Sequence, residues 1–359
     1  QIITLERRWF GAPMPDGRTV ALKHEVGIQA RILGPGFHWL IPFIYKTTKQ
    51  NFIVIQKNQV GVLRAITGAP IPIGQVMAKK IECDLFQDGE AFIKNGGQKG
   101  PQLDILPDGE YKINPHLFEV SIVDAVIVED DEVAIVESIA GKQVERSGGN
   151  FGAPVDCDNF QNAEDFLKNG GEKGPQINFL KPGFYRINKI MFIVEKRKMV
   201  EIPGGMIGLI EAADGNRIPE GRLLARKVEG HNNFFDGQAF INNGGERGRQ
   251  IDVLMPGKYR INTALFKVID IVPWTSIQAD QVGIVTVKEG QPIVDPTKIA
   301  AEELGLNVHN NFQNPAGFLA ANGQKGLQIP VLRAGNYSIN PWFADVEKVD
   351  MTRVEIGFC

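Results

Sequence analysis

Two cysteines and two histidines occupy one register of this sequence. Each lies three residues before a phenylalanine, at Cys83, Cys157, His231 and His309. Two thiolates and two imidazoles form a common zinc ligand set when they converge, with metal–ligand bonds of ~2.0–2.3 Å. These four residues belong to successive copies of a repeat, and stacked repeats hold equivalent residues far apart. We therefore predict that each side chain is satisfied locally at the entrance to a helix, and we predict no metal site.

The stretch "GGQKG", residues 96–100, resembles part of a phosphate-binding loop. Such a loop requires G-x-x-x-x-G-K-[ST] between a strand and the start of a helix, so that helix amides face the phosphate. Here the glycines follow a predicted helix, and neither Ser nor Thr follows Lys99. The pattern therefore favours a helix C-cap with a left-handed glycine.

No other set of residues predicts catalysis. The acidic residues 129–132 precede a predicted strand and are interpreted as a solvated loop rather than an acid–base pair. The remaining histidines, His24, His38 and His116, lie in unrelated contexts. The sequence therefore predicts no catalytic, cofactor-binding or metal-binding residues and a protein that is not an enzyme. The formal charge of −3, with no basic stripe, argues against nucleic acid as a partner.

A long segment that recurs four times must position these residues. "FIKNGGQKGPQLDILPDGEYKINPHLFEV" and its near-copies begin at Phe92, Phe166, Phe240 and Phe318. The tyrosine after the glycine turn recurs in steps of 74, 74 and 78 residues, at Tyr111, Tyr185, Tyr259 and Tyr337. Four extra residues are expected within 287–308. A period this long indicates that each repeat is close to a small domain.

Each repeat is expected to open with an apolar strand, such as "NQVGVLRAITG". A variable loop and a short helix follow, the first helix starting near Asp88 and stopping at residues 95–97. In the fourth copy Asn322 replaces the left-handed glycine, as asparagine commonly does. Two strands then follow, "PQLDIL" and "EYKINPHLFEV", and the first alternates polar and apolar residues as a half-buried strand should.

The predicted fold is therefore mainly β, in the α+β class. It is a tandem array of ~74-residue units, each with three or four short strands and one short helix, stacked as an elongated stave. The core of the first repeat is predicted to contain Phe92, Ile105, Tyr111, Ile113 and Phe118, with counterparts in the others.

The predicted boundaries are a divergent N-terminal module without the helix (1–50), four repeats and the start of a further unit (351–359). The repeats span 51–124, 125–198, 199–272 and 273–350. Residues 356–358 repeat the "VGI" of residues 282–284 as "IGF", so we expect the sequence to belong to a longer protein.

Two motifs resemble a known family. "GPGFHWLIPFIYK", preceded by "VGIQARIL", resembles the opening of the SPFH, or band 7, family of stomatins, prohibitins and flotillins. "NGGQKGPQLDILPDGEYKINPHLF" is similar to repeats of bacterial flotillin-like members, and "LPDGEYKI" resembles the β-rich repeats of the major vault protein. The resemblance covers nearly the whole chain. It implies membrane anchoring and side-by-side assembly into rings, domes or cages.

The expected function is a structural scaffold that assembles laterally with itself into a homo-oligomeric ring, cage or filament. The alternative is a monomeric or small-oligomer adaptor that binds a protein or lipid through its repeat loops. No run of 18 apolar residues occurs, so an anchor is expected before Gln1. Arg7 and Arg8 would then retain the repeats on the cytoplasmic side. Segment 36–45 is expected either to touch the bilayer or to lie in the core.

Overall fold

The computed structural model describes residues 1–146, 149–294, 300–301 and 303–351. The chain divides into two compact units. The first unit comprises residues 1–130, 134–144 and 152–196, and the second comprises residues 131–133, 145–151 and 197 onward. The end predicted to start a further repeat, residues 356–358, lies outside the described residues.

The first unit contains the N-terminal module, repeat 1 and most of repeat 2. The N-terminal module has three strands: β1 (Ile2–Arg7), β2 (Gly27–Leu33) and β3 (Tyr45–Gln50). Repeat 1 has five strands and a helix: β4 (Ile53–Ile55), β5 (Gln59–Ala65), α1 (Gly89–Lys94), β6 (Gly100–Pro101), β7 (Gly109–Tyr111) and β8 (Phe118–Asp124). Repeat 2 has β9 (Val126–Val128), β10 (Glu132–Ser138), α2 (Ala163–Lys168), β11 (Gly174–Leu180), β12 (Gly183–Tyr185) and β13 (Phe192–Lys198).

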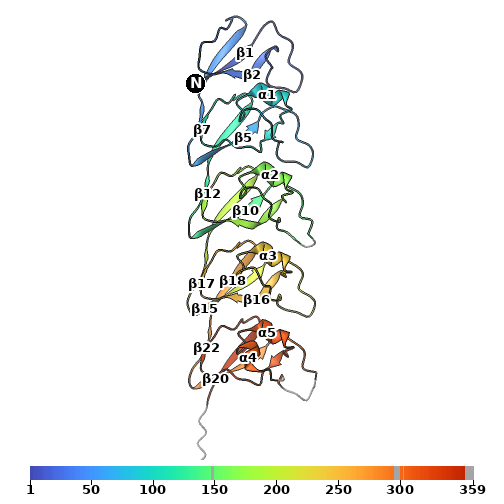
Figure 1. Ribbon diagram of the computed structural model, residues 1–359, viewed down its shortest axis with the longest axis vertical. Coiled ribbons are helices and arrows are strands. Elements are labelled where there is room, and N and C mark those ends of the chain that lie inside the picture. Colours follow the sequence, from blue (N-terminus) through green and yellow to red (C-terminus); the bar gives the residue numbers. More distant parts are fainter. Residues whose placement is uncertain (147–148, 295–299, 302, 352–359) are drawn as a thin grey trace, which may run out of the picture. The chain divides into compact units, whose positions relative to one another are not determined.

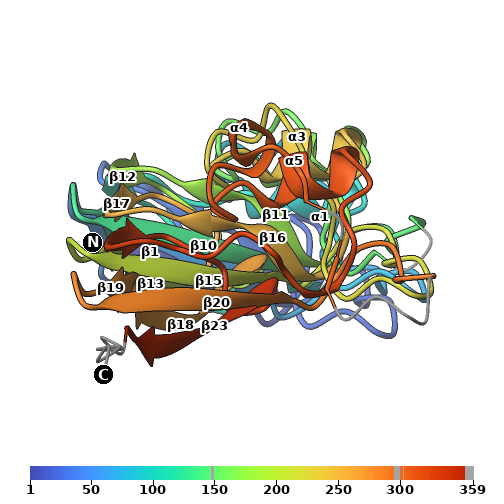
Figure 2. The same ribbon diagram turned by 90° about the horizontal axis from the view of Figure 1, so that it is seen from below.

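The second unit contains repeats 3 and 4. Repeat 3 has β14 (Val200–Ile202), β15 (Met206–Ala212), α3 (Gly237–Asn242), β16 (Gly248–Leu254), β17 (Gly257–Tyr259) and β18 (Phe266–Pro273). Repeat 4 has β19 (Thr275–Ile277), β20 (Gln281–Val287), α4 (Leu306–His309), α5 (Pro315–Ala320), β21 (Gly326–Leu327), β22 (Gly335–Tyr337) and β23 (Ala344–Asp350). In this unit α3 and α5 lie on the same side of their sheets (Figure 2).

The same two sheets recur in every repeat, as the labelled elements of each repeat show (Figure 1). The first long strand is the centre of a three-stranded sheet, in the orders β6-β5-β8, β11-β10-β13, β16-β15-β18 and β21-β20-β23. A two-stranded sheet joins the short opening strand to the strand after the glycine turn, as β4-β7, β9-β12, β14-β17 and β19-β22. The predicted β-rich tandem repeat is confirmed.

Two details of the prediction are wrong. The described residues of each repeat form five strands rather than three or four, because the short strand that opens the repeat was not predicted. Repeat 4 has a second helix, α4, before α5. The N-terminal module lacks a helix among its described elements, and its sheet, β2-β1-β3, has the same central first strand as the repeats.

A β-bulge explains why the alternation predicted for the second strand fails. The register of β10 with β11 shifts between Ile135 and Glu137, and as a result two successive residues of β11, Gln176 and Ile177, are both buried. A bulge places two residues of one strand opposite one of its partner. In repeat 1 the same shift leaves Ile105 only half-buried, so the core prediction is wrong there.

The other predicted core residues of repeat 1 are confirmed. Phe92, Tyr111, Ile113 and Phe118 are all buried. The Phe92 and Phe118 rings meet edge to face, with centroids 4.8 Å apart, a favourable aromatic geometry. Repeats 2, 3 and 4 bury the equivalent phenylalanines, Phe166 and Phe192, Phe240 and Phe266, and Phe318 in its α5 helix.

The short helices begin and end as predicted. The Asp88 side chain accepts the Ala91 N–H at 2.9 Å and so caps α1. After the helix, Gly96 has φ +77° and the equivalent Asn322 has φ +59°. Both are left-handed, as a helix C-cap requires.

Candidate functional site: the left-handed turns and the repeat junctions

Three consecutive residues in each repeat form a left-handed turn before the helix. In repeat 1 these are Asp84, Leu85 and Phe86, with φ values of 52°, 47° and 64°. The equivalent sequences are D-N-F, N-N-F and N-N-F in repeats 2, 3 and 4, and all nine residues also have positive φ. Aspartate and asparagine tolerate this region better than other side chains, but a phenylalanine there is strained.

The histidines of the Cys/His register close this turn. In repeats 3 and 4 the imidazole Nδ1 of His231 accepts the Phe234 N–H at 2.8 Å, and that of His309 accepts the Phe312 N–H at 2.9 Å. In repeat 1 the Cys83 thiol instead donates to the Ile81 carbonyl at 3.4 Å. Cysteine and histidine share this register as buried side chains beside the phenylalanine of the turn.

Burial keeps these groups uncharged. It raises the pKa of the Cys83 thiol to about 11 and also raises the pKa of the Cys157 thiol. It lowers the pKa values of His231 and His309. A thiol with a raised pKa is a poor nucleophile and a poor metal ligand, because the thiolate is the reactive form.

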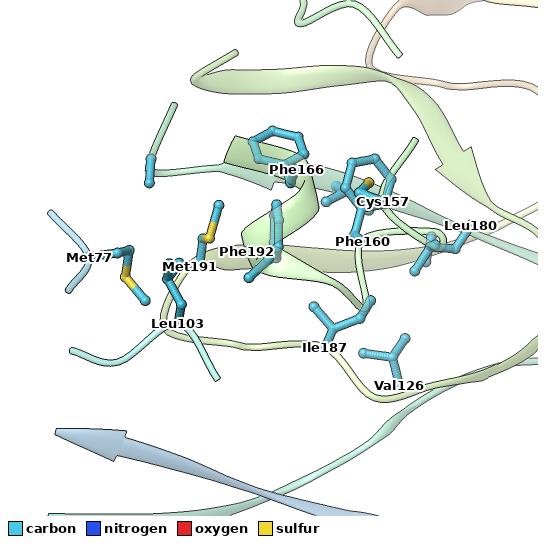
Figure 3. Packing of buried hydrophobic residues seen from close by; sticks show 14 of the residues in the cluster. Met77, Leu103, Val126, Cys157, Phe160, Phe166, Leu180, Ile187, Met191 and Phe192 are labelled. Carbon is cyan, nitrogen blue, oxygen red and sulfur yellow. The ribbon is translucent and has the colours of Figure 1, made fainter. Parts of the chain in front are cut away.

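The four residues lie in the cores of their own repeats. Cys157 lies beside Phe160 and near Phe166 (Figure 3), and Cys83 packs among the equivalent phenylalanines of repeat 1. The His231 ring lies 4.5 Å from that of Phe234. Among the described residues, no group of three or more His, Cys, Asp or Glu side chains could hold a metal ion.

The "GGQKG" loop has a packing role at its second glycine. A Cβ on Gly97 would collide with the ring of Phe92, which is fully buried. Gly171, Gly245 and Gly323 meet the equivalent rings in the same way. Gly96 and Gly97 therefore serve different purposes: Gly96 adopts a left-handed backbone conformation, and Gly97 leaves room for an aromatic ring.

The acidic stretch 129–132 leads into β10, whose first residue is Glu132. Asp131 and Glu132 form ion pairs with Lys198, at 2.9 and 3.3 Å. Asp131 and Lys198 are largely exposed, so these pairs add little stability.

A buried asparagine connects consecutive repeats within each unit. In the first unit, Asn188 of repeat 2 donates two 2.9 Å hydrogen bonds to the carbonyls of Gln102 and Leu103 in repeat 1. Its Oδ1 accepts the Ile190 N–H at 3.0 Å, so the amide is satisfied on both sides. Asn114 makes the same contacts with the N-terminal module, at 2.9 Å, and Asn340 makes them with repeat 3, at 3.2 and 3.0 Å.

A buried glutamine presents the carbonyls that this asparagine binds. The Nε2 of Gln102 donates to the carbonyls of Gln98 and Gly100, at 2.9 and 2.8 Å. Gln29, Gln176, Gln250 and Gln328 make the equivalent bonds in the other sheets. Neither register was singled out from the sequence, although both recur with the period of the tyrosines.

A second contact between consecutive repeats comes from the turn that follows the first long strand. The residue that makes it immediately precedes a glycine. In repeat 4 this residue is Glu289, whose Oε2 accepts the N–H groups of Leu223 and Leu224 at 3.3 and 2.8 Å. Within the same unit, Asp214 accepts those of Asn150 and Phe151, each at 3.0 Å. In repeat 1 the hydroxyl of Thr67 accepts the Thr19 N–H at 3.2 Å.

Segment 36–45 exposes large apolar side chains. Phe37, Trp39 and Phe43 are 94%, 87% and 86% exposed. The interpretation of this segment as core is therefore wrong for these three residues. No described helix is long and apolar enough to cross a membrane.

No family model matches the chain, and no curated protein matches its sequence.

Proposed function

We propose that the protein is a structural scaffold that assembles laterally with copies of itself into a ring, cage or filament. The observation that carries the proposal is a surface feature that recurs once per repeat. The last strand lies at an edge of each three-stranded sheet, and it exposes a large aliphatic side chain at Ile122, Ile193, Ile269 and Val349. Edge strands are natural sites for association with another chain.

Recurrence distinguishes this feature from ordinary surface. A single exposed aliphatic residue needs no explanation. The four exposed aliphatic residues occupy different positions along their strands, so the feature that recurs is the exposed edge strand, which allows each repeat to contact the equivalent repeat of a neighbouring chain. Heterologous contacts of this kind close into rings or continue as filaments, depending on the rotation between subunits.

Membrane association, with the repeats in the cytoplasm, is the second part of the proposal. Its support is the exposed aromatic segment 36–45, together with Arg7 and Arg8 and the resemblance to the SPFH family. Aromatic side chains favour the interface between membrane and water. The same segment favours the alternative of a lipid-binding adaptor, in which the chain remains monomeric.

Light scattering of the protein distinguishes the two. The scaffold predicts a mass many times the 39.6 kDa of one chain. Lysine at Ile122, Ile193, Ile269 and Val349 together should reduce that mass. Lysine at Ile73, which is fully exposed and lies in a loop, is the matched control and should leave it unchanged. A monomeric protein at high concentration would contradict the scaffold and favour the adaptor.

A further inference from the structure

The junction between repeats 1 and 2 differs from the equivalent junction between repeats 3 and 4. Ala140 occupies the position of Glu289, so the side chain that would accept two backbone N–H groups is absent. Val76 and Met77 are the equivalents of Leu223 and Leu224. The residues that follow each pair, Ala78 and Ala225, form the same β-bridge to an equivalent glutamine, Gln102 and Gln250. No described atom accepts the N–H of either Val76 or Met77.

A cavity opens at this place. Its volume is about 430 Å³, within the range of roughly 300–1,000 Å³ that is usual for ligand sites. Met77, Leu103, Ala140 and Leu167 provide apolar lining. Met77 and Leu103 also face Met191 in the core of repeat 2 (Figure 3).

The rim of the cavity is basic. Five lysines and one glutamate line it, whereas the equivalent cavity between repeats 3 and 4 has four basic and two acidic residues. Glu164 pairs with Lys80 and Lys168, at 3.5 and 2.7 Å. The other lysines form no ion pair with any described carboxylate; they are Lys79, Lys142 and Lys173.

A second carboxylate is also missing from this junction. In repeats 2 and 3 and in the N-terminal module, a glutamate accepts the backbone N–H of the residue that follows the β-bridge to the buried glutamine. These glutamates are Glu172, Glu246 and Glu25. In repeat 1 this position is Gln98, whose Oε1 accepts the Lys79 N–H at 2.8 Å. The amide makes the same hydrogen bond without the negative charge, and the lysines are left uncompensated.

We propose that this cavity binds a small monocarboxylate with an apolar chain. The ligand carboxylate would accept the N–H groups of Val76 and Met77, as Glu289 does for their equivalents, and the lysines would neutralise it. Its apolar chain would lie over Met77 and Leu103. This inference does not depend on the scaffold function.

Butyrate is the probe, because its carboxylate follows a short aliphatic chain as in glutamate. In an amide NMR spectrum of the intact protein, butyrate should shift Val76 and Met77 in a saturable way. Ala140→Glu should weaken this response by at least about tenfold, since its own carboxylate would occupy the position. Glu289→Ala should create a second response at Leu223 and Leu224, and this variant tests the idea even if Ala140→Glu does not fold.

Inorganic phosphate is the comparison probe. It carries the charge but leaves the apolar lining uncovered, so it should bind more weakly than butyrate. Phosphate binding as tight as butyrate binding would overturn the assignment of the ligand as a monocarboxylate. Absence of a saturable shift at Val76 and Met77, or a shift unchanged by Ala140→Glu, would overturn the site itself.

Discussion

Repeats 2 and 4 solve the same structural problems with different residues. Cys157 packs beside the phenylalanine of the left-handed turn in repeat 2, and His309 accepts a hydrogen bond from that turn in repeat 4. After the helix, the left-handed position is Gly170 in one and Asn322 in the other. Each register therefore selects a property, such as burial beside the turn or tolerance of positive φ, rather than one residue type.

The central strands of repeats 2 and 4 also differ by compensating changes in side-chain volume. A Cβ on Gly283 would lie 3.0 Å from Cδ1 of Ile277, which is tight. Repeat 2 has Ala134 at this register, and there the residue equivalent to Ile277 is the smaller Val128. The extra methyl group of the alanine therefore accompanies the loss of a methyl group from its neighbour.

The largest expected effect is at a register where all four repeats agree. Gly171→Ala and Gly323→Ala each place a methyl group against a buried phenylalanine ring. Overpacking of this kind costs about 1–3 kcal/mol, and we expect the upper end because these rings are buried. Hydrogen exchange of the altered repeat measures the loss. Two near-neutral variants would show that this glycine is as replaceable as Gly170.

The next effect is at the junctions. Asn340→Ala removes two hydrogen bonds to buried carbonyls of repeat 3 and should cost about 2–3 kcal/mol. Asn336→Ala, at an exposed position of β22, is the matched control and should change stability by less than about 0.5 kcal/mol. Thermal unfolding of both variants provides the comparison, and equal losses would refute the connecting role of Asn340.

A smaller effect is expected where the repeats differ. Gly170→Val should destabilise repeat 2 by about 1–2 kcal/mol, because a β-branched residue is strained at positive φ. Gly170→Asn should be nearly neutral, since Asn322 has that conformation in repeat 4. Hydrogen exchange in repeat 2 tests the pair, and indistinguishable variants would contradict the assigned role of the glycine.

The smallest expected effect is the pH dependence of the turns. The pKa values of His231 and His309 in the folded protein are lowered from 6.5. The contribution of each neutral imidazole to folding stability is therefore complete above pH 6.5 and is lost as pH falls through the lowered pKa. Glu229, Lys227 and Asp236 also act on His231. The pKa of Cys83 is raised from 9.0 to about 11. The contribution of its neutral thiol to folding stability is therefore complete below pH 9.0 and is lost as the pH rises toward 11.

Hydrogen exchange of the backbone amides at several pH values distinguishes the turns closed by histidine from the turn that contains Cys83. Acid should loosen the turns of repeats 3 and 4, and alkali should loosen that of repeat 1. His309→Cys should remove the acid response from repeat 4 while leaving the turn closed. An unchanged acid response in this variant would assign the effect to another group.

The sequence predicts what repeats visibly and misses what depends on backbone geometry. Helix α1 could be predicted because the residues that flank it, such as the N-cap Asp88, act locally. Ile105 could not be placed, because a bulge in the strand pairing breaks the expected alternation. Short strands such as β4 carry too few residues to show a period.

Only some of the residues at the candidate site could be predicted from the sequence. The Cys/His register was recognised as locally satisfied, but its partner, the Phe234 N–H, depends on a left-handed turn that residue types alone do not specify. The Asn188 contact joins residues 85 and 86 positions apart. Its recurrence in "IN" motifs was the available signal.

Chemical cross-linking of the assembled protein, prepared from a mixture of ¹⁴N- and ¹⁵N-labelled chains, tests the scaffold most directly. Peptide pairs that contain both isotopes must come from different chains. Lateral assembly predicts that such pairs join lysines of the same repeat, for example repeat 2 with repeat 2. A protein that gives no mixed pairs, or mixed pairs that join repeat 1 mainly to repeat 4, would contradict lateral assembly of equivalent repeats.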